Sequence, residues 1–280
     1  MNILITGARG FIGNHLYNHM KLAHSITRIF SPSQPAGKQN SYSVDLTNNN
    51  EVETLIQELS KTKYDCVIHL ASKMASPKQT KDVELLQYNI AITENLINIT
   101  KILKPNVLIN FSSMAIYPNV SGSFSEKSMP GPQKNQDCFY GLSKYCAEVM
   151  IDFLLRKEKI RIVHLRVSQV QGKGMRNNRI IPVMQRELME SNTITVFGNG
   201  KRISNFIGID KLLKEIQFFI ENDVAGTYNI GDMNISYIDL ARTQIDQYGD
   251  KNSTINRKPQ GNKEEFMLDI YKLKSLHDSE

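Results

Sequence analysis

Three glycines near the start of the chain, in the stretch TGARGFIG, constrain its fold more than any other feature. Gly7, Gly10 and Gly13 follow the apolar segment NILI and open the amphipathic run FIGNHLYNHMKL. A glycine at such a turn lets the backbone bend sharply, a second lets it approach a pyrophosphate, and a third lets a helix pack closely on the strand. The spacing predicts a strand, a phosphate-binding turn and a helix whose free N–H groups face the phosphates. An ordinary strand-to-helix turn is the alternative.

Segments typical of strands and helices alternate after this turn. The expected strands are HSITRIF, SYSVDL, YDCVIHLAS and NVLINFSS, and DVELLQYNIAITENLINITKIL is an expected helix between the last two. This alternation predicts an α/β fold with a doubly wound parallel sheet. We expect residues 1–170 to form a dinucleotide-binding domain to which 201–234 return, and 171–280 to form mainly a small C-terminal substrate-binding lobe.

The charge balance favours a small anionic ligand over a nucleic acid. The 280 residues include 34 basic and 28 acidic side chains, which gives a net charge of +6. The basic residues are scattered, whereas a nucleic-acid backbone is followed by clustered Lys and Arg. The three cysteines lack the spacing of a metal site, so no metal is expected. No export signal and no membrane-spanning apolar run is recognised, so we expect a cytoplasmic protein without a membrane partner.

The end of the second expected strand bears on the choice of dinucleotide. NAD sites usually carry an acidic residue there, which bonds the ribose hydroxyls. Here the stretch reads IFSPSQPAGK, and the first carboxylate after it is Asp45. Ser31 and Ser33 can bond a 2′-phosphate, and Arg9 or Lys38 can neutralise it. These residues favour NADP, with NAD as the alternative.

The stretch YGLSK places a tyrosine and a lysine on one face of an expected helix. Tyr140 and Lys144 are four residues apart, so their side chains are neighbours on a helix. A free tyrosine, with a pKa of about 10, is a poor base at neutral pH. A lysine cation and an oxidised nicotinamide beside it would lower that pKa, so that the phenol could exchange a proton with a substrate hydroxyl. Taken alone, the stretch would also suit a surface helix.

The spacing GxxGxxG, followed far downstream by YxxxK, resembles the extended short-chain dehydrogenase/reductase family, in its NAD(P)-dependent epimerase/dehydratase branch for nucleotide sugars. TGARGFIG, HLAS, FSSMAIYP, FYGLSKYCAE and VFGNGKRISNFIGIDKL stand in the family's order. The resemblance implies a Rossmann fold and a catalytic set of Ser113, Tyr140 and Lys144. The motifs and the resemblance together give these expected cofactor contacts: Gly7, Arg9, Gly10, Phe11, Ile12, Gly13, Ser31, Asp45, Leu46, Leu70, Ala71, Tyr140 and Lys144.

The sequence departs from parts of the family's pattern. The family's 4,6-dehydratases carry an Asp-Glu pair after the active-site hydroxyl residue, where this chain has Met114 and Ala115. Neither side chain can act as an acid or base, so 4,6-dehydration is not expected. Ser204 stands where the family has a phosphate-binding arginine, and Gln169 replaces its usual asparagine. The expected substrate contacts are Ser113, Gln169, Arg202 and Arg257.

We therefore expect an NAD(P)-dependent epimerase or 4-keto reductase that acts on a nucleotide-linked hexose by hydride transfer. Two alternatives stay open: a reductase of a non-sugar ketone or aldehyde, and a non-catalytic NAD(P)-binding regulator. The apolar residues of YCAEVMIDFLL suit a homodimer contact through the tyrosine-bearing helix, although an ordinary core face would carry the same residues. Asn89, on the preceding helix, suits either an active-site role or a bond to backbone.

Overall fold

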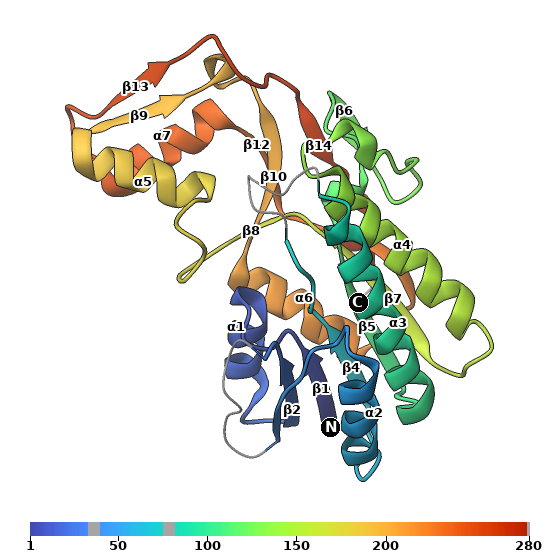
Figure 1. Ribbon diagram of the computed structural model, residues 1–280. Helices are drawn as coiled ribbons and strands as arrows, with labels where there is room; N and C mark the ends of the chain where they lie inside the picture. Colours follow the sequence, from blue (N-terminus) through green and yellow to red (C-terminus); the bar gives the residue numbers. More distant parts are fainter. Residues whose placement is uncertain (33–39, 75–81, 279–280) are drawn as a thin grey trace. The chain divides into compact units, whose positions relative to one another are not determined.

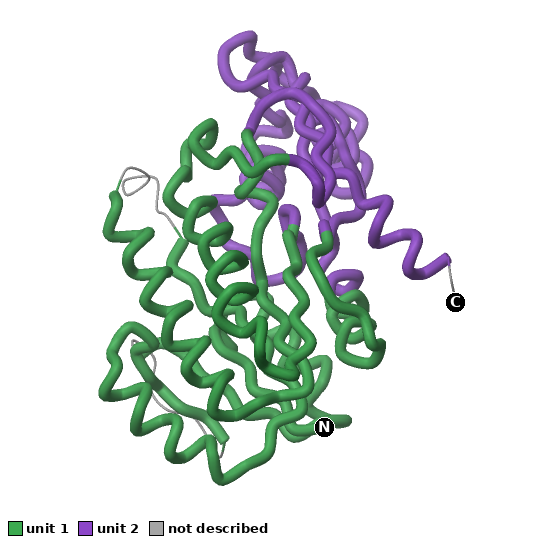
Figure 2. Tube along the Cα trace, turned by 90° about the vertical axis from the view of Figure 1, so that its right-hand side faces the viewer, with its two compact units in different colours: residues 1–118, 129–167, 213–228 green, residues 119–128, 168–212, 229–280 purple. Residues whose placement is uncertain are grey.

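The computed structural model describes residues 1–32, 40–74 and 82–278 (Figure 1). They form two compact units, which Figure 2 distinguishes by colour. Unit 1 contains Met1–Pro118, Met129–Val167 and Leu213–Tyr228, and unit 2 contains Asn119–Ser128, Ser168–Leu212 and Asn229–Glu280. The stretch 201–234, which we expected to return to the first domain, is thus divided between the units.

A seven-stranded sheet is the centre of unit 1, in the order β11-β7-β5-β4-β1-β2-β3. Its strands are β1 (Asn2–Thr6), β2 (Ser25–Phe30), β3 (Ser41–Ser43), β4 (Cys66–His69), β5 (Val107–Ser113), β7 (Arg161–Val167) and β11 (Gly226–Ile230). Neighbouring strands from β7 to β3 run parallel. From β1 the chain builds outward in one direction through β2 and β3, and then in the other through β4, β5 and β7. This is the predicted doubly wound, Rossmann-like α/β fold, with its topological switch point between β1 and β4.

Helices cover the sheet of unit 1. They are α1 (Phe11–Met20), α2 (Asn49–Leu59), α3 (Glu84–Leu103), α4 (Cys138–Leu155) and α6 (Ile209–Glu221), with short 3₁₀ turns η1 (Met114–Ile116) and η2 (Pro132–Lys134). Of α6, residues 213–221 belong to unit 1. One buried cluster joins α2, α3 and α4 to Leu4, Val67 and Leu108 on the strands, so these helices share one face of the sheet. Figure 1 shows them side by side.

The α3 helix illustrates how its sequence determines its packing. Leu85, Asn89, Ile92, Leu96 and Ile99 recur every three or four residues and are buried, which gives the helix one stripe that faces the protein. The helix ends at Lys104, whose left-handed conformation (φ 45°) stops the helical hydrogen-bond ladder.

Unit 2 is built from short strands and three helices. The strands are β6 (Gly122–Phe124), β8 (Gln169–Gln171), β9 (Thr193–Val196), β10 (Ile203–Gly208), β12 (Met233–Ser236), β13 (Thr254–Arg257) and β14 (Phe266–Leu268). They pair as β12-β10-β8, β13-β9 and β14-β6. The helices are α5 (Ile180–Ser191), α7 (Tyr237–Tyr248) and α8 (Tyr271–His277), and η3 (Gly198–Gly200) is a short 3₁₀ turn. A buried cluster that includes Met184, Phe206 and Leu240 joins α5 and α7 to β10. Across the described residues, no helix has the length and apolar character to cross a membrane.

Candidate functional site

The predicted cofactor and catalytic residues of unit 1 lie at one edge of the parallel sheet. The register pairs Thr6 with His69, which are the last residues of β1 and β4, and it pairs His69 with Asn110 and Asn110 with His164. From this level β5 and β7 continue three residues further, to Ser113 and Val167. The glycine loop follows β1, Leu70 and Ala71 follow β4, and Ser113 ends β5. Ligands of open α/β sheets bind beyond the carboxyl ends of the strands, near the switch point. The sequence-predicted residues therefore gather where this fold binds ligands.

The first glycine of the loop cannot be replaced without strain. Gly7 has a φ of +68°, and a Cβ on it would lie 2.7 Å from the backbone nitrogen of Ala71. A Cβ on Gly13 would lie 2.8 Å from the Cα of Ala8, so the helix packs closely on the loop. Thr6 ties the two strand ends together, because its Oγ1 lies 2.8 Å from His69 Nδ1 and accepts a bond from Ala71 N at 3.3 Å.

The start of α1 fits an anionic group. Its N-cap is Gly10, which is exposed and provides no side-chain cap, and its first turn from Phe11 to Asn14, all of it described, carries no acidic residue. The first N–H groups of a helix have no partner within the helix, and the helix dipole favours a negative charge beside them. Phe11 and Ile12 bring two of these N–H groups. The loop thus suits the pyrophosphate of a dinucleotide.

Arg9 lies against the end of β2. Its guanidinium carbon is 3.9 Å from the centroid of the Phe30 ring, which holds the cation beside the last residue of the strand. Ser31 follows Phe30 and is exposed. Ser33 and Lys38, also named as phosphate contacts from the sequence, lie outside the described residues.

The loop after β3 is held by a turn of its own. Asp45 Oδ1 accepts hydrogen bonds from the Thr47 backbone N at 2.9 Å and from Thr47 Oγ1 at 2.8 Å. The side chain of Leu46 is buried. The Asp45 carboxylate thus stabilises the turn that it begins.

Lys144 is buried beside Tyr140 on α4. Its Nζ donates a 2.8 Å hydrogen bond to the carbonyl oxygen of Phe111 on β5, and it lies 5.9 Å from the centroid of the Tyr140 ring. Burial lowers the pKa of Lys144 to about 8, against the opposite effect of the Glu148 carboxylate. The lysine is therefore mainly a cation at neutral pH, in a place with few groups to solvate it. The helix predicted from YGLSKYCAEVMIDFLL is therefore buried at Lys144 and is not a surface helix there.

The turn after Ser113 fixes the position of the serine. Ser113 Oγ accepts a 3.1 Å bond from the Ala115 backbone N, so its own hydrogen can be donated elsewhere. Asn135 Nδ2 donates to the carbonyl oxygens of Ala115 at 2.6 Å and Tyr117 at 2.9 Å. Gly141 of α4 packs on the same turn, because a Cβ there would collide with the Ala115 carbonyl oxygen.

Asn89 bonds backbone, which is one of the two interpretations that the sequence left open, and its place next to an active site stays a prediction. Its Oδ1 accepts a 2.8 Å bond from Lys73 N, and its Nδ2 donates to Lys73 O and to Ser143 Oγ, both at 3.0 Å. Ser143 Oγ in turn donates to the carbonyl oxygen of Tyr140 at 2.8 Å. Asn89 thus bonds backbone and also joins α3 to the helix that carries Tyr140.

Sequence reasoning missed a buried ion pair behind Lys144. Arg166 Nη2 lies 2.7 Å from Glu148 Oε2, and both side chains are buried. Glu148 follows Lys144 at the spacing that separates Lys144 from Tyr140, but no short-range pattern in the sequence pairs it with Arg166.

The substrate residues predicted in unit 2 are only partly gathered. Gln169 Nε2 donates a 2.7 Å bond to Ser204 Oγ, so the two positions that depart from the family pattern are partners. The guanidinium carbon of Arg202 lies 5.1 Å from the centroid of the Tyr237 ring, and its buried Nε has no hydrogen-bond partner among the described residues. Arg257 is exposed on β13.

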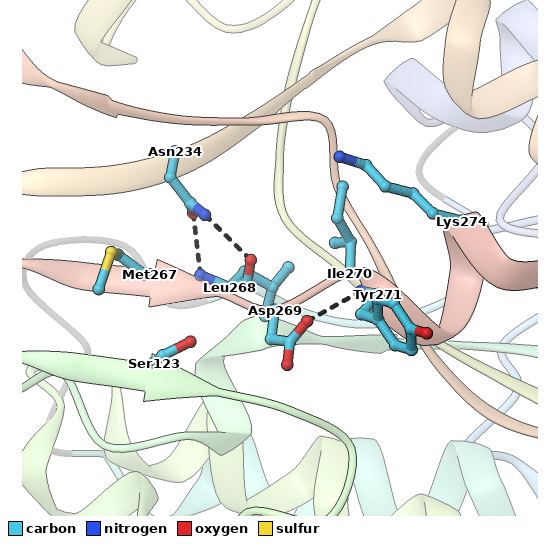
Figure 3. Close-up of a pocket in the computed structure, with 8 residues that line it drawn as sticks. All are labelled: Ser123, Asn234, Met267, Leu268, Asp269, Ile270, Tyr271 and Lys274. Atoms are coloured by element: carbon cyan, nitrogen blue, oxygen red, sulfur yellow. Dashed lines mark hydrogen bonds between the residues drawn. The ribbon is translucent and has the colours of Figure 1, made fainter.

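Unit 2 also holds a shallow pocket of about 290 Å³ (Figure 3). Asn234 shapes one side by bonding both the backbone N and O of Leu268, at 2.9 and 3.1 Å, and Asp269 Oδ1 accepts a 2.8 Å bond from Tyr271 N. Its described lining includes none of the predicted substrate contacts: Ser123, Asn234, Met267, Leu268, Asp269, Ile270, Tyr271 and Lys274.

Comparison with characterised proteins finds relatives of several activities. The chain is 26% identical over 269 residues to dTDP-D-glucose 4,6-dehydratase of Dictyostelium discoideum, which covers 87% of this chain and 61% of that protein. It is 28% identical over 232 residues to GDP-6-deoxy-D-talose 4-dehydrogenase of Aggregatibacter actinomycetemcomitans, which covers 80% of this chain and 72% of that protein. The chain thus spans about three fifths of the length of the first relative.

Solved structures with the same fold include two epimerases of Bacillus cereus. UDP-N-acetylglucosamine 4-epimerase superposes with a TM-score of 0.81 at 25% identity, over 99% of this chain and 90% of that one. UDP-glucuronic acid 4-epimerase, in complex with NAD, superposes with a TM-score of 0.79 at 26% identity, over 98% and 92%. A family profile matches residues 3–231, well over half of the chain. The protein belongs to the NAD dependent epimerase/dehydratase family.

Proposed function

We propose that the protein is an NAD(P)-dependent enzyme that epimerises a nucleotide-linked hexose or reduces its 4-keto form. The observation that carries this proposal is the Lys144 ammonium, buried against the Phe111 carbonyl and beside Tyr140. A buried lysine charge is costly, so its presence at the ligand-binding edge of the sheet favours a catalytic use. Ser113 ends the strand that provides this carbonyl.

The proposed residues act on a secondary alcohol of the sugar. The bound cofactor would accept a hydride from the sugar carbon or return one to it. As the hydride leaves, the Tyr140 phenolate takes the hydroxyl proton, so the alcohol becomes a ketone and the tyrosine becomes neutral. Ser113 donates a hydrogen bond to the same oxygen, and Lys144 stabilises the phenolate. A reduction runs these transfers in the opposite direction.

The residues after Ser113 argue against a dehydratase, although one relative is named as such. Elimination of water needs an acid and a base at the site. Met114 and Ala115 begin the 3₁₀ turn η1 there, and neither side chain can exchange a proton. Epimerisation and 4-keto reduction need only the transfers described above.

We further propose that NADP is the preferred cofactor, with NAD as the alternative. Arg9 lies on the Phe30 ring next to the exposed Ser31, and residues 30–32 include no carboxylate to repel a 2′-phosphate. The epimerase neighbour in complex with NAD supports the alternative.

The cofactor preference predicts an effect limited to one dinucleotide. Replacing Arg9 by alanine should weaken NADP binding about tenfold or more, because a charged hydrogen bond contributes about 1.5–3 kcal/mol. NAD affinity should stay nearly the same, and titration calorimetry measures both. Tighter binding of NAD to the wild type, with no effect of Arg9→Ala on either cofactor, would show that NADP is not preferred.

The bond between Gln169 and Ser204 favours a second candidate, the reduction of a non-sugar ketone or aldehyde. In this bond Gln169 donates to the hydroxyl of Ser204, which stands where the family has a phosphate-binding arginine. Arg202 and Arg257 are the proposed remaining contacts for a diphosphate. A panel of UDP-, dTDP- and GDP-linked hexoses, their 4-keto forms and diphosphate-free ketones, supplied with each cofactor, separates the candidates. Turnover confined to diphosphate-free ketones would exclude the sugar-nucleotide proposal, and cofactor binding without any turnover would indicate a regulator.

We also propose a homodimer formed through α4. Val149, Phe153 and Leu154 are exposed on this helix, at 49%, 58% and 43% of their surfaces. Contact with a second copy would remove these apolar side chains from water. Light scattering should give twice the monomer mass for the wild type and the monomer mass for Phe153→Glu.

We propose a cytoplasmic location, which suits the free thiols of Cys66, Cys138 and Cys146.

A further inference from the structure

A buried polar cluster lies one helical turn beyond Lys144. The Arg166 guanidinium bonds both carboxylate oxygens of Glu148, through Nε at 3.1 and 3.2 Å and through Nη2 at 2.7 Å. Its Nη1 donates to Tyr117 Oη at 2.9 Å. We call these three residues the Arg166 cluster. Their side chains are almost fully buried, at 6%, 4% and 1% exposure for Arg166, Glu148 and Tyr117.

The cluster joins the elements that carry the proposed catalytic residues. Glu148 lies on α4, four residues after Lys144, and Tyr117 directly follows the turn η1 that begins after Ser113. Arg166 lies on β7, where it pairs in register with Ser112 of β5. One guanidinium therefore bonds both the helix of Tyr140 and the turn next to Ser113.

Stability alone does not account for such a cluster. A buried ion pair loses about as much hydration free energy as it gains in attraction, and apolar residues of similar volume often do equally well. A guanidinium that bonds a carboxylate through two parallel hydrogen bonds does, however, fix the relative position of the two elements that carry these groups.

Among the residues that the structure describes, few charged or titratable groups face Lys144. Tyr140 and Glu148 lie on its own helix, His69 faces it from β4, and Arg166 and Tyr117 lie beyond Glu148. Burial, and secondly the charge of Lys144, lowers the pKa of His69 to about 3, so this imidazole is neutral at physiological pH. Among the described residues, Glu148 is the carboxylate whose charge raises the pKa of Lys144 against the effect of burial, and Arg166 shares this carboxylate.

On the basis of the proposed function, we propose that Arg166, Glu148 and Tyr117 are positioning residues. They hold the helix of Tyr140 and Lys144 in a fixed position relative to Ser113. They also keep Lys144 an ammonium ion. Arg166 directs the carboxylate of Glu148 and ties it to the serine turn. Glu148 then provides the counter-charge one turn from the lysine. None of the three needs to touch substrate.

The ionisation of Tyr140 tests this proposal without any substrate. The chain contains no tryptophan, so the ultraviolet band of tyrosinate can be followed with little interference. The titration of Tyr140 is the difference between each protein and the same protein carrying Tyr140→Phe. In Glu148→Gln the midpoint should move to higher pH by about one unit, because the lysine loses its proton more easily and stabilises the phenolate less.

Asp152→Asn is the matched control. Asp152 lies four residues after Glu148 on α4, its side chain is 62% exposed, and it bonds His164 at 3.0 Å. Its replacement also removes one carboxylate from the helix, but it should leave the Tyr140 midpoint unchanged. An equal shift in both variants would contradict a specific role for Glu148.

Glu148→Gln leaves Arg166 buried without its carboxylate, which could prevent folding. The double variant Glu148→Gln/Arg166→Gln removes both charges of the ion pair and so avoids this. It should show a smaller upward shift, because the Arg166 cation is removed together with the carboxylate, while near-ultraviolet circular dichroism reports a native fold. A native fold with an unchanged midpoint of the Tyr140 titration overturns the proposal. A failure of both variants to fold also overturns it, because the cluster would then be required only for folding. Lack of turnover by the wild type on every substrate would instead refute the proposed function, and the titration would still be readable.

Discussion

Lys144 carries its charge among the core residues of unit 1, where hydration is lost and a carbonyl oxygen and a neighbouring carboxylate replace only part of it. Its pKa of about 8, against 10.5 for a free lysine, shows that burial outweighs both partners. The difference is equivalent to about 3 kcal/mol of destabilisation when the lysine is charged. A residue retained at such a cost is expected to act in function rather than in stability.

Lys144→Met should therefore stabilise the protein and inactivate it. At pH 7 the free energy of unfolding should rise by about 2 kcal/mol, because the charge penalty disappears while the Phe111 carbonyl loses a partner. Below pH 8 the lysine is charged in both the folded and unfolded states, so the full penalty applies. Between about pH 8 and 10.5 only the folded state releases its proton, so the wild type gains stability and the difference shrinks. Urea unfolding at several pH values measures this, and a less stable variant at pH 7 would contradict it.

At the scale of elements, the contact between α4 and the turn after Ser113 sets the distance between the tyrosine and the serine. Gly141 allows this contact, because it has no Cβ and so leaves room for the Ala115 carbonyl and for Pro132. A Cβ on residue 141 would lie 3.0 Å from the Cβ of Pro132. Asn135 also holds this turn, by donating hydrogen bonds to two of its carbonyl oxygens.

Gly141→Ala should push the helix away from this turn. We expect kcat to fall about a hundredfold, because small misplacements of reacting groups have effects of this size. The affinity for the dinucleotide should change little, since the glycine loop lies on other elements. Ala147→Gly, on the same helix, is the control for altered helix propensity and should retain most of its activity. Normal activity of Gly141→Ala would show that the contact does not position Tyr140.

The elements that the sequence predicted well are those with long apolar patterns. Strands β1 to β5 and the helices α3 and α4 appear at the expected places. The short strands β6, β8, β12, β13 and β14 were not predicted, because three or four residues hold too little periodicity to identify a strand. Such strands form through pairing with partners far away in the sequence, as Phe266–Leu268 do with Gly122–Phe124.

At the scale of the whole molecule, residues at fixed spacing were easier to predict than partners distant in sequence. The glycine loop and the pair of Tyr140 and Lys144 can be found within short windows, and the structure gathers them with Ser113 at one edge of the sheet. Arg166 and its link to Glu148 could not be found in this way, because a lone arginine in a strand does not reveal its partner. The bond of Gln169 with Ser204 likewise depends on the parallel pairing of β8 with β10.

The central claim is that Tyr140 moves the proton while a hydride passes between the sugar carbon and the cofactor. The most direct measurement follows deuterium from C4 of a labelled nucleotide hexose into the nicotinamide in a single turnover, for the wild type and for Tyr140→Phe. We predict that deuterium is transferred by the wild type, and that the rate falls about 10²–10⁴-fold in Tyr140→Phe with cofactor affinity retained. Transfer at the same rate in both proteins would contradict this account.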